Sequence, residues 1–184
     1  MTARTRLLQA ADRLFYQEGI RTTGIDHLVA EAGVAKMTLY NQFGSKDGLV
    51  AAYLRARHDD WLRRLDTHLG KASSPIEEIL AVFDAYIESA SQPGHRGCAF
   101  LNAAAELPDR DHPARAVVAE DKESVRSLLR EKAEAADLPD PGELAEQLFL
   151  LLEGGIVTAG VRGTPDPLRS ARAAALSLLQ ARRR

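Results

Sequence analysis

The sequence predicts an all-α protein of about nine helices. β-branched residues are sparse beside Ala, Leu, Arg and Glu, and only 5% of the residues are aromatic, a composition that favours helix over sheet. Apolar residues recur at spacings of three and four along most of the chain, and no segment shows the alternation of a strand. The 184 residues suffice for one or two small domains with a core of their own.

The first two helices are predicted near the N-terminus. Residues 3–18 carry one apolar face, made of Leu7, Leu8, Ala11, Leu14 and Phe15. Gly19 stands where a left-handed helix C-cap is expected. Thr23, followed three residues later by Asp26, is close to a capping box and predicts a second short helix over about 24–32.

Gly33 separates the second helix from a third, predicted over about 35–42. A tight turn between helices needs a positive φ, which glycine adopts without steric strain. Gly44 ends the third helix. Ser45 is the predicted N-cap of a long fourth helix that keeps an apolar face to about residue 68.

The rest of the chain is also helical in pattern. Ser74 followed by Pro75 predicts a cap and a first helical residue after a linker over 70–74. The later segments are a loop over 91–97, a short helix over 98–107, and longer helices over 113–138, 142–161 and 166–181.

Composition also limits the compartment. The single cysteine, Cys98, excludes an internal disulfide and fits a reducing cytosol. Charges interrupt the apolar pattern of the first 15 residues, so no signal peptide is expected there. The longest apolar run, residues 148–152, is far shorter than the ~20 residues of a membrane helix. We therefore expect a cytoplasmic protein without a membrane partner.

Net charge alone does not indicate a nucleic-acid binder. The chain carries 24 Lys and Arg against 26 Asp and Glu, a net charge of −2. Residues 1–50 hold six basic and five acidic side chains, so any basic surface must be local.

The two short helices joined at Gly33 have the spacing of a helix-turn-helix. The third helix would then present polar and aromatic groups outward: Lys36, Thr38, Tyr40 and Asn41. Asn and Lys side chains can read purines in a DNA groove, while Tyr and Thr hydroxyls bind phosphate. The alternative is a packed helix with a polar outer face, because short helix-turn-helix patterns arise often by chance.

The surrounding motifs resemble the N-terminal domain of the TetR family of transcriptional regulators over about residues 4–54. The matching marks, in order, are LF-x-x-x-G (14–19), Thr22-Thr23, A-G-V (32–34), T-L-Y-x-x-F (38–43) and S-K (45–46). The segment GCAFLNAAAEL (97–107) is similar to the sixth-helix region of many members.

This resemblance implies a DNA-binding domain over 1–45 and a ligand-binding and dimerisation domain over 46–184. It implies a homodimer on a palindromic double-stranded DNA operator, released by a small-molecule effector. Lys36, Thr38, Tyr40 and Asn41 would face the operator, and Thr23 and Lys46 would hold phosphates at helix N-termini. The full implied DNA-binding set is Thr22, Thr23, Lys36, Met37, Thr38, Tyr40, Asn41 and Lys46.

Four residues depart from the family pattern. Ala35 replaces the usual Ser or Thr cap of the third helix, a loss of ~1 kcal/mol. Val29 stands where alanine is usual, and Met37 and Gly48 are less common residues at their positions. Met37 either touches a thymine methyl or covers the helix. These departures leave the operator sequence open.

The second half offers candidates for an effector pocket, which are polar or aromatic residues on otherwise apolar faces. They are Trp61, Phe83, Tyr86, Phe100, Asn102, Phe149 and Glu153. The alternative for Trp61 and the phenylalanines is a place in the core, and for Tyr86 a place at the edge of the core. Asn102 could instead cap or bond its local backbone. For Glu153, the alternatives to a cationic ligand are a salt bridge or an exposed position.

The small residues of GGIVTAG (154–160) permit close helix approach. With the last helix, 168–180, they predict the dimer seam, the alternative being a helix pair inside one monomer. A symmetric dimer would place two recognition helices ~34 Å apart.

Two other functions would fit parts of the sequence. An enzyme could use Cys98 with His95 or His112, and a helical protein-interaction module could share the N-terminal pattern. Cys98 could also respond to oxidants, although a small core residue is the plainer interpretation. The five histidines lack paired metal spacing, and no cofactor motif is found, so we expect no enzyme, metal or cofactor.

Overall fold

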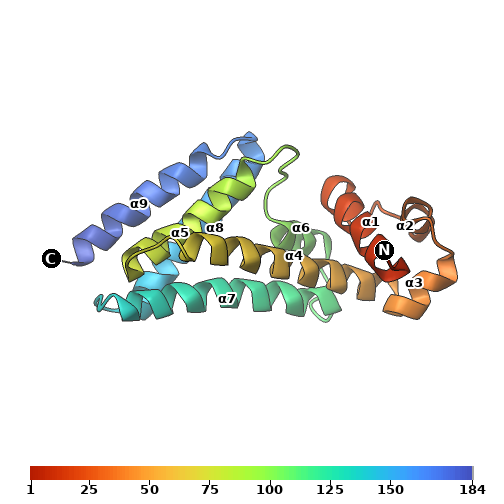
Figure 1. The fold of residues 1–184 in the computed structure, drawn as a ribbon, viewed down its shortest axis with the longest axis horizontal. Helices are drawn as coiled ribbons and strands as arrows, with labels where there is room; N and C mark the ends of the chain where they lie inside the picture. The colour runs from red at the N-terminus through yellow and green to blue at the C-terminus, as the bar shows by residue number, and fades with distance from the viewer. Residues whose placement is uncertain (184) are drawn as a thin grey trace. The chain divides into compact units, whose positions relative to one another are not determined.

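A computed structural model describes residues 1–183 and confirms the all-α prediction. Within these residues there are nine helices and no strand (Figure 1). The helices are α1 (Ala3–Glu18), α2 (Ile25–Ala32), α3 (Lys36–Phe43), α4 (Lys46–Leu69), α5 (Pro75–Ala90), α6 (Ala99–Glu106), α7 (Pro113–Ala135), α8 (Pro141–Arg162) and α9 (Asp166–Arg182).

The chain forms two compact units. Unit 1 contains Met1–Asp60 and Ala99–Asp121, and unit 2 contains Trp61–Cys98 and Lys122–Arg184. The long helices α4 and α7 each supply residues to both units. The predicted functional boundary at residue 45 stays a prediction, because it concerns roles rather than packing.

The first three helices of unit 1 pack through buried leucines. Leu7, Leu28 and Leu39 are fully buried, one from each of α1, α2 and α3. Gly33 has φ 61° and ψ 44°, and its amide donates to carbonyls of the last turn of α2. The left-handed turn that the sequence predicted between α2 and α3 is therefore confirmed.

Several helix ends differ from the prediction. The N-cap of α2 is Gly24, not Thr23, because the Thr23 hydroxyl turns back to the end of α1. Gly19 has a positive φ of 98°, but its ψ of 153° lies outside the left-handed helical region. α7 ends at Ala135, three residues early, because Asp137 adopts a φ of 52° and the Leu138 amide donates to the Ala133 carbonyl.

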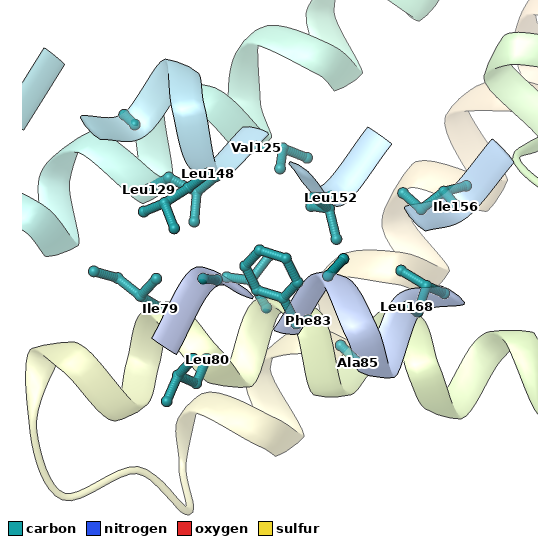
Figure 2. Close-up of a cluster of buried hydrophobic side chains, with 14 of the residues drawn as sticks. Ile79, Leu80, Phe83, Ala85, Val125, Leu129, Leu148, Leu152, Ile156 and Leu168 are labelled. Atoms are coloured by element: carbon teal, nitrogen blue, oxygen red, sulfur yellow. The ribbon is translucent and has the colours of Figure 1, made fainter. Parts of the chain in front are cut away.

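The core of unit 2 is built around Phe83 on α5. Figure 2 shows this ring among side chains from α5, α7, α8 and α9, and it has no exposed surface. Around it lie Ile79, Val125, Leu129, Leu148, Leu152, Ile156 and Leu168. α5 begins as predicted, with the Ser74 hydroxyl accepting from the Glu77 amide at 3.3 Å.

Two glycines of α8 are required by close packing inside the chain. A Cβ at Gly155 would lie 3.0 Å from the Ala171 side chain of α9. A Cβ at Gly160 would lie 2.8 Å from the Gly97 backbone. The alternative of an intramolecular helix pair therefore explains part of the GGIVTAG segment. Gly154, by contrast, has nothing within 4 Å of such a Cβ.

α8 is the one helix in the described part of the chain with the length and hydropathy, 1.4 on average, of a membrane span. Leu148, Leu152 and Ile156 on this helix pack into the core of unit 2. A core helix of a soluble domain meets the same criteria, so α8 does not indicate a membrane protein.

Candidate nucleic-acid interface and effector groove

α3 is held by its inner face and near its C-terminus. Leu39 is fully buried beneath it. Near its C-terminus, the Arg4 guanidinium donates to the Gln42 carbonyl at 3.0 Å and stacks 4.5 Å from the Phe43 ring centroid. This contact from the start of α1 satisfies a carbonyl in the last turn of α3, where helices leave carbonyls unpaired. A helix of eight residues is thereby fixed by its neighbours.

The outer face of α3 is open to solvent. Met37 is 66% exposed and Tyr40 39% exposed. Lys36 and Asn41 are also exposed, and Thr38 is half-buried. The structure therefore brings these five predicted residues together on one accessible helix. As expected, no side chain caps its N-terminus at Ala35.

Lys36 is paired with an acid on the neighbouring helix. Its Nζ donates to Oδ1 of Asp26 at 2.9 Å, linking the first residue of α3 to the first turn of α2. The hydrogen bond and the charge of Asp26 raise the pKa of the Lys36 ammonium. Both side chains remain largely exposed, 52% for Lys36 and 85% for Asp26, so the pair lies at the surface.

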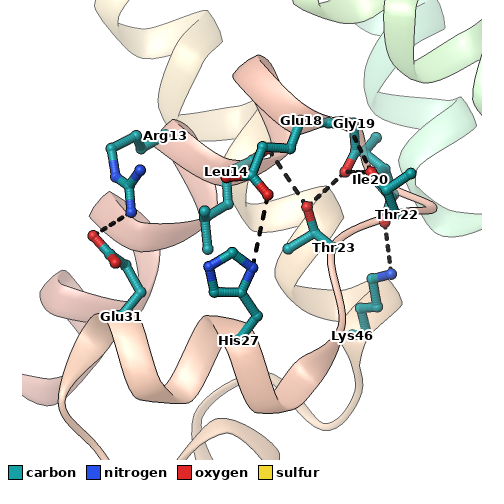
Figure 3. Close-up of polar contacts among 10 residues, drawn as sticks. All are labelled: Arg13, Leu14, Glu18, Gly19, Ile20, Thr22, Thr23, His27, Glu31 and Lys46. Carbon is teal, nitrogen blue, oxygen red and sulfur yellow. Dashed lines mark hydrogen bonds and ion pairs between the residues drawn. The ribbon is translucent and has the colours of Figure 1, made fainter.

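The two threonines before α2 play local roles. Thr23 is fully buried, and its hydroxyl donates to the Gly19 carbonyl at 2.6 Å (Figure 3). The expectation that Thr23 holds a phosphate is corrected, because its hydroxyl is enclosed. Thr22 is exposed, with its hydroxyl donating to the Glu18 carbonyl at 2.5 Å.

Lys46 makes a contact inside unit 1 that the sequence did not predict. Its Nζ donates to the Ile20 carbonyl at 2.6 Å and lies 6.0 Å from the Phe15 ring centroid (Figure 3). Burial lowers the pKa of this ammonium, while the charges of Asp47 and Glu106 act in the opposite direction. Lys46 thus ties the start of α4 to the turn after α1. Ser45 caps α4 as predicted, accepting from the Gly48 amide at 2.9 Å.

Ion pairs neutralise other basic groups of unit 1. Arg13 pairs with Glu31, as Figure 3 shows, and Arg57 pairs with Asp12 at 2.7 Å. These pairs agree with the near-neutral charge of the N-terminal segment.

Unit 2 contains a groove between α4 and α7. Its volume is about 850 Å³, and its apolar lining comes from Trp61, Leu62, Leu65, Leu69 and Leu128. Charged side chains that include Arg63, Asp66, Arg130 and Glu134 also line it. The groove can accept a molecule with an apolar body and polar edges.

One of the seven predicted pocket residues, Trp61, lines this groove. Tyr86 packs against Trp61, with the two ring centroids 5.6 Å apart. Phe83 lies in the core of unit 2, and Phe149 packs against that core. Phe100 is buried and Asn102 half-buried, and both belong to unit 1.

Glu153 forms a salt bridge with Lys122, at 2.9 Å, as one of the alternatives anticipated. The same ammonium lies 3.4 Å from the Cys98 sulfur. His112 belongs to unit 1, where its Nε2 lies 3.3 Å from a carboxylate oxygen of Asp47. Among residues 1–183, no group of three His, Cys, Asp or Glu side chains could hold a metal.

α8 presents an exposed apolar stripe. Leu150, Val157 and Val161 are 60%, 49% and 83% exposed, and Gly154 lies open between them. Their spacing of four, three and four residues places them on one helix face. We call these four residues the α8 stripe. Large apolar groups aligned in this way are typical of a protein–protein contact.

Two family models match the chain. Residues 7–53 match the model described as bacterial regulatory proteins of the tetR family, and residues 75–175 match a tetracycline repressor-like C-terminal domain. The second match alone spans more than half of the chain.

The chain belongs to the TetR family of transcriptional regulators. It is a DNA-binding, ligand-responsive regulator built on this family's fold. Members of the family are DNA-binding regulators rather than enzymes, and they are typically cytoplasmic.

Known TetR structures share the whole fold. SCO4454, a TetR-family regulator from Streptomyces coelicolor, is 31% identical with a TM-score of 0.90, covering 98% of this chain and 95% of its own. The regulator sav143 from Streptomyces avermitilis is 34% identical with a TM-score of 0.81, covering 95% and 98%. ComR of Escherichia coli, a helix-turn-helix transcriptional repressor, is 27% identical over 165 residues, 85% of this chain and 79% of ComR.

Sequence reasoning missed two residues that contact α3, Arg4 and Asp26. Arg4 contacts α3 from 38 residues away, and nothing in its local sequence signals this contact. Asp26 was assigned only to a helix start, although its position in the first turn of α2 was visible. The helix-turn-helix pattern itself could have suggested that the starts of α2 and α3 meet.

Proposed function

We propose that this TetR-family regulator is a cytoplasmic, non-enzymatic repressor that binds a near-palindromic operator as a homodimer. A small molecule bound in the groove between α4 and α7 would release it. The observation that carries the DNA-binding part is the open face of α3, where Met37 and Tyr40 stay exposed above the buried Leu39. Exposed aromatic and apolar groups on a helix fixed from below suit contact with base edges.

The proposed operator contacts are Lys36, Met37, Thr38, Tyr40 and Asn41 on α3. Thr22, which is exposed just before α2, is also a proposed contact. Thr23 leaves the predicted set, since its fully buried hydroxyl donates to the Gly19 carbonyl. Lys46 stays in the set, since its half-exposed ammonium makes one hydrogen bond, to the Ile20 carbonyl, and has two further protons for a phosphate. Met37 is exposed enough to meet a thymine methyl.

The proposed dimer seam includes the α8 stripe together with α9. This proposal is supported by the alignment of Leu150, Val157 and Val161 and by the absence of any packing partner near Gly154. An isologous contact of two such helices would pair the same surface on both copies. It would present two copies of α3 to one palindromic site.

The effector is proposed to be a mainly apolar molecule with polar edges, in keeping with the lining of the groove. Trp61 is the only tryptophan of the chain and lines this groove, so its fluorescence reports directly on occupancy. Compounds processed by the products of genes beside the operator form the test panel. Binding should change the emission of Trp61, and Leu128→Arg should abolish the change while operator binding persists.

The sign of regulation is tested by transcription in vitro from a promoter that carries the selected operator. Repression predicts fewer transcripts as protein is added and recovery when the effector follows. Relatives named as repressors, ComR among them, support this sign. An increase in transcripts would make the protein an activator and would contradict the proposal.

A further inference from the structure

The pairing of Lys36 with Asp26 places a hydrogen-bond donor and an acceptor side by side on the side of unit 1 that is proposed to face DNA. The Nζ–Oδ1 distance is 2.9 Å, and both side chains are more than half exposed. Neither group is used up by this contact. An ammonium has three protons, and an ionised carboxylate has about four lone-pair positions.

One base pair offers the matching arrangement. In the major groove a G·C pair shows two acceptors on guanine, N7 and O6, followed by the donor N4 of cytosine. O6 and N4 are hydrogen-bonded to each other, so they lie about 2.9 Å apart. A donor and an acceptor at the spacing of Lys36 and Asp26 can therefore face them at the same time.

We propose that Asp26 and Lys36 act as one reading unit that recognises a G·C base pair in each operator half-site. Lys36 donates to guanine O6 and N7, and Asp26 accepts from cytosine N4. The inference rests on the proposed operator binding through α3 and deepens it by assigning one base and a residue of α2 to that surface.

An A·T pair fits this unit less well. Its donor, adenine N6, lies between two acceptors, adenine N7 and thymine O4. If Asp26 accepts from N6, Lys36 can satisfy one of these acceptors, while the other faces the carboxylate without a proton between them. In the G·C pair the donor, cytosine N4, lies beyond both guanine acceptors, so no acceptor of the base pair has to face the carboxylate.

The pair also has an electrostatic consequence. An isolated lysine on this surface would bind any phosphate and contribute to binding of all sequences. Asp26 cancels the charge of Lys36 and repels phosphates. Lys36 therefore contributes most to the binding free energy where a base pair bonds to both groups. Removing Asp26 should therefore reduce discrimination and increase binding to unrelated DNA.

The test is selection of binding sites from random DNA by the full-length protein and three variants, Asp26→Ala, Lys36→Ala and the double variant. Glu31→Ala is the matched control, because it removes one acid of the same helix that pairs with Arg13 instead. Thermal unfolding first verifies that each variant is folded, as expected for exposed residues.

The expected result is a G·C position in each parental half-site whose preference falls at least about fivefold in Asp26→Ala, with the other positions unchanged. Lys36→Ala should relax the same position, and the double variant should lose no more there than either single variant. Asp26→Ala should bind unrelated DNA more tightly, with a salt slope steeper by about one. Glu31→Ala should keep the parental base preference.

An enriched parental site whose base preferences are all retained by Asp26→Ala would overturn this inference and leave the proposed function standing. Additive losses at different positions would also overturn it, because they would show two independent contacts. No enriched site with folded parental protein would instead contradict the proposed function, and the inference with it.

Discussion

Replacing Val157 with aspartate should dissociate the proposed dimer. Val157 lies at the middle of the α8 stripe and is 49% exposed in the single chain. At a two-fold contact the residue counts twice, so about one whole valine side chain leaves water, contributing roughly 1.5–2 kcal/mol. Val157→Asp loses this contribution and places two carboxylates in an apolar seam, where unpaired charges are strongly unfavourable.

The combined loss should be about 3 kcal/mol or more, which corresponds to a dissociation constant raised at least about 100-fold. Sedimentation velocity over a range of protein concentrations measures this change. Leu62→Asp is the matched control, because Leu62 is a similarly exposed apolar residue, 42%, on α4 and outside the stripe. Val157→Asp sedimenting as the parent does, or Leu62→Asp dissociating equally, would refute the assignment of the seam.

Three further predictions concern residues of unit 1. Gly48→Ala should lower stability by about 1–3 kcal/mol in thermal unfolding, because a Cβ there would lie 2.1 Å from the Phe43 carbonyl oxygen. Gly142→Ala is the control, because the space around its Cβ is open. Equal stability of the two variants would contradict the close contact between Gly48 and Phe43. Lys46→Ala should lower the free energy of unfolding in urea by about 1 kcal/mol through loss of its hydrogen bond to Ile20, and an unchanged midpoint would show that this bond contributes nothing. Lys36→Ala should leave that midpoint unchanged, since the pair with Asp26 is exposed, and a large drop would mean that the pair is structural.

Local patterns predicted the helices well, because apolar spacing and caps are properties of neighbouring residues. Gly33, Ser45 and Ser74 were assigned from such patterns and confirmed. Thr23 shows where a pattern misleads, since a threonine before a helix can cap that helix or turn back to the preceding one. Here it turns back, and only the packing of α1 against α2 decides between the two.

The site was less predictable because it depends on contacts between distant residues. Lys46 has a side chain long enough to reach either a phosphate or the Ile20 carbonyl, and its sequence position does not distinguish them. Phe83 and Phe149 were candidates for a pocket because aromatic residues line both pockets and cores. The groove between α4 and α7 depends on the distance between two helices, and the apolar spacing along each helix does not predict that distance.

The central claim is that the exposed face of α3 reads a specific DNA site. The most direct test is selection of binding sites from fragmented genomic DNA by the parental protein, with Tyr40→Ala as the matched variant. The account predicts an enriched near-palindrome for the parent, weakened or lost in Tyr40→Ala, while folding and dimerisation of the variant persist. A site that Tyr40→Ala selects and binds as tightly as the parent would contradict it.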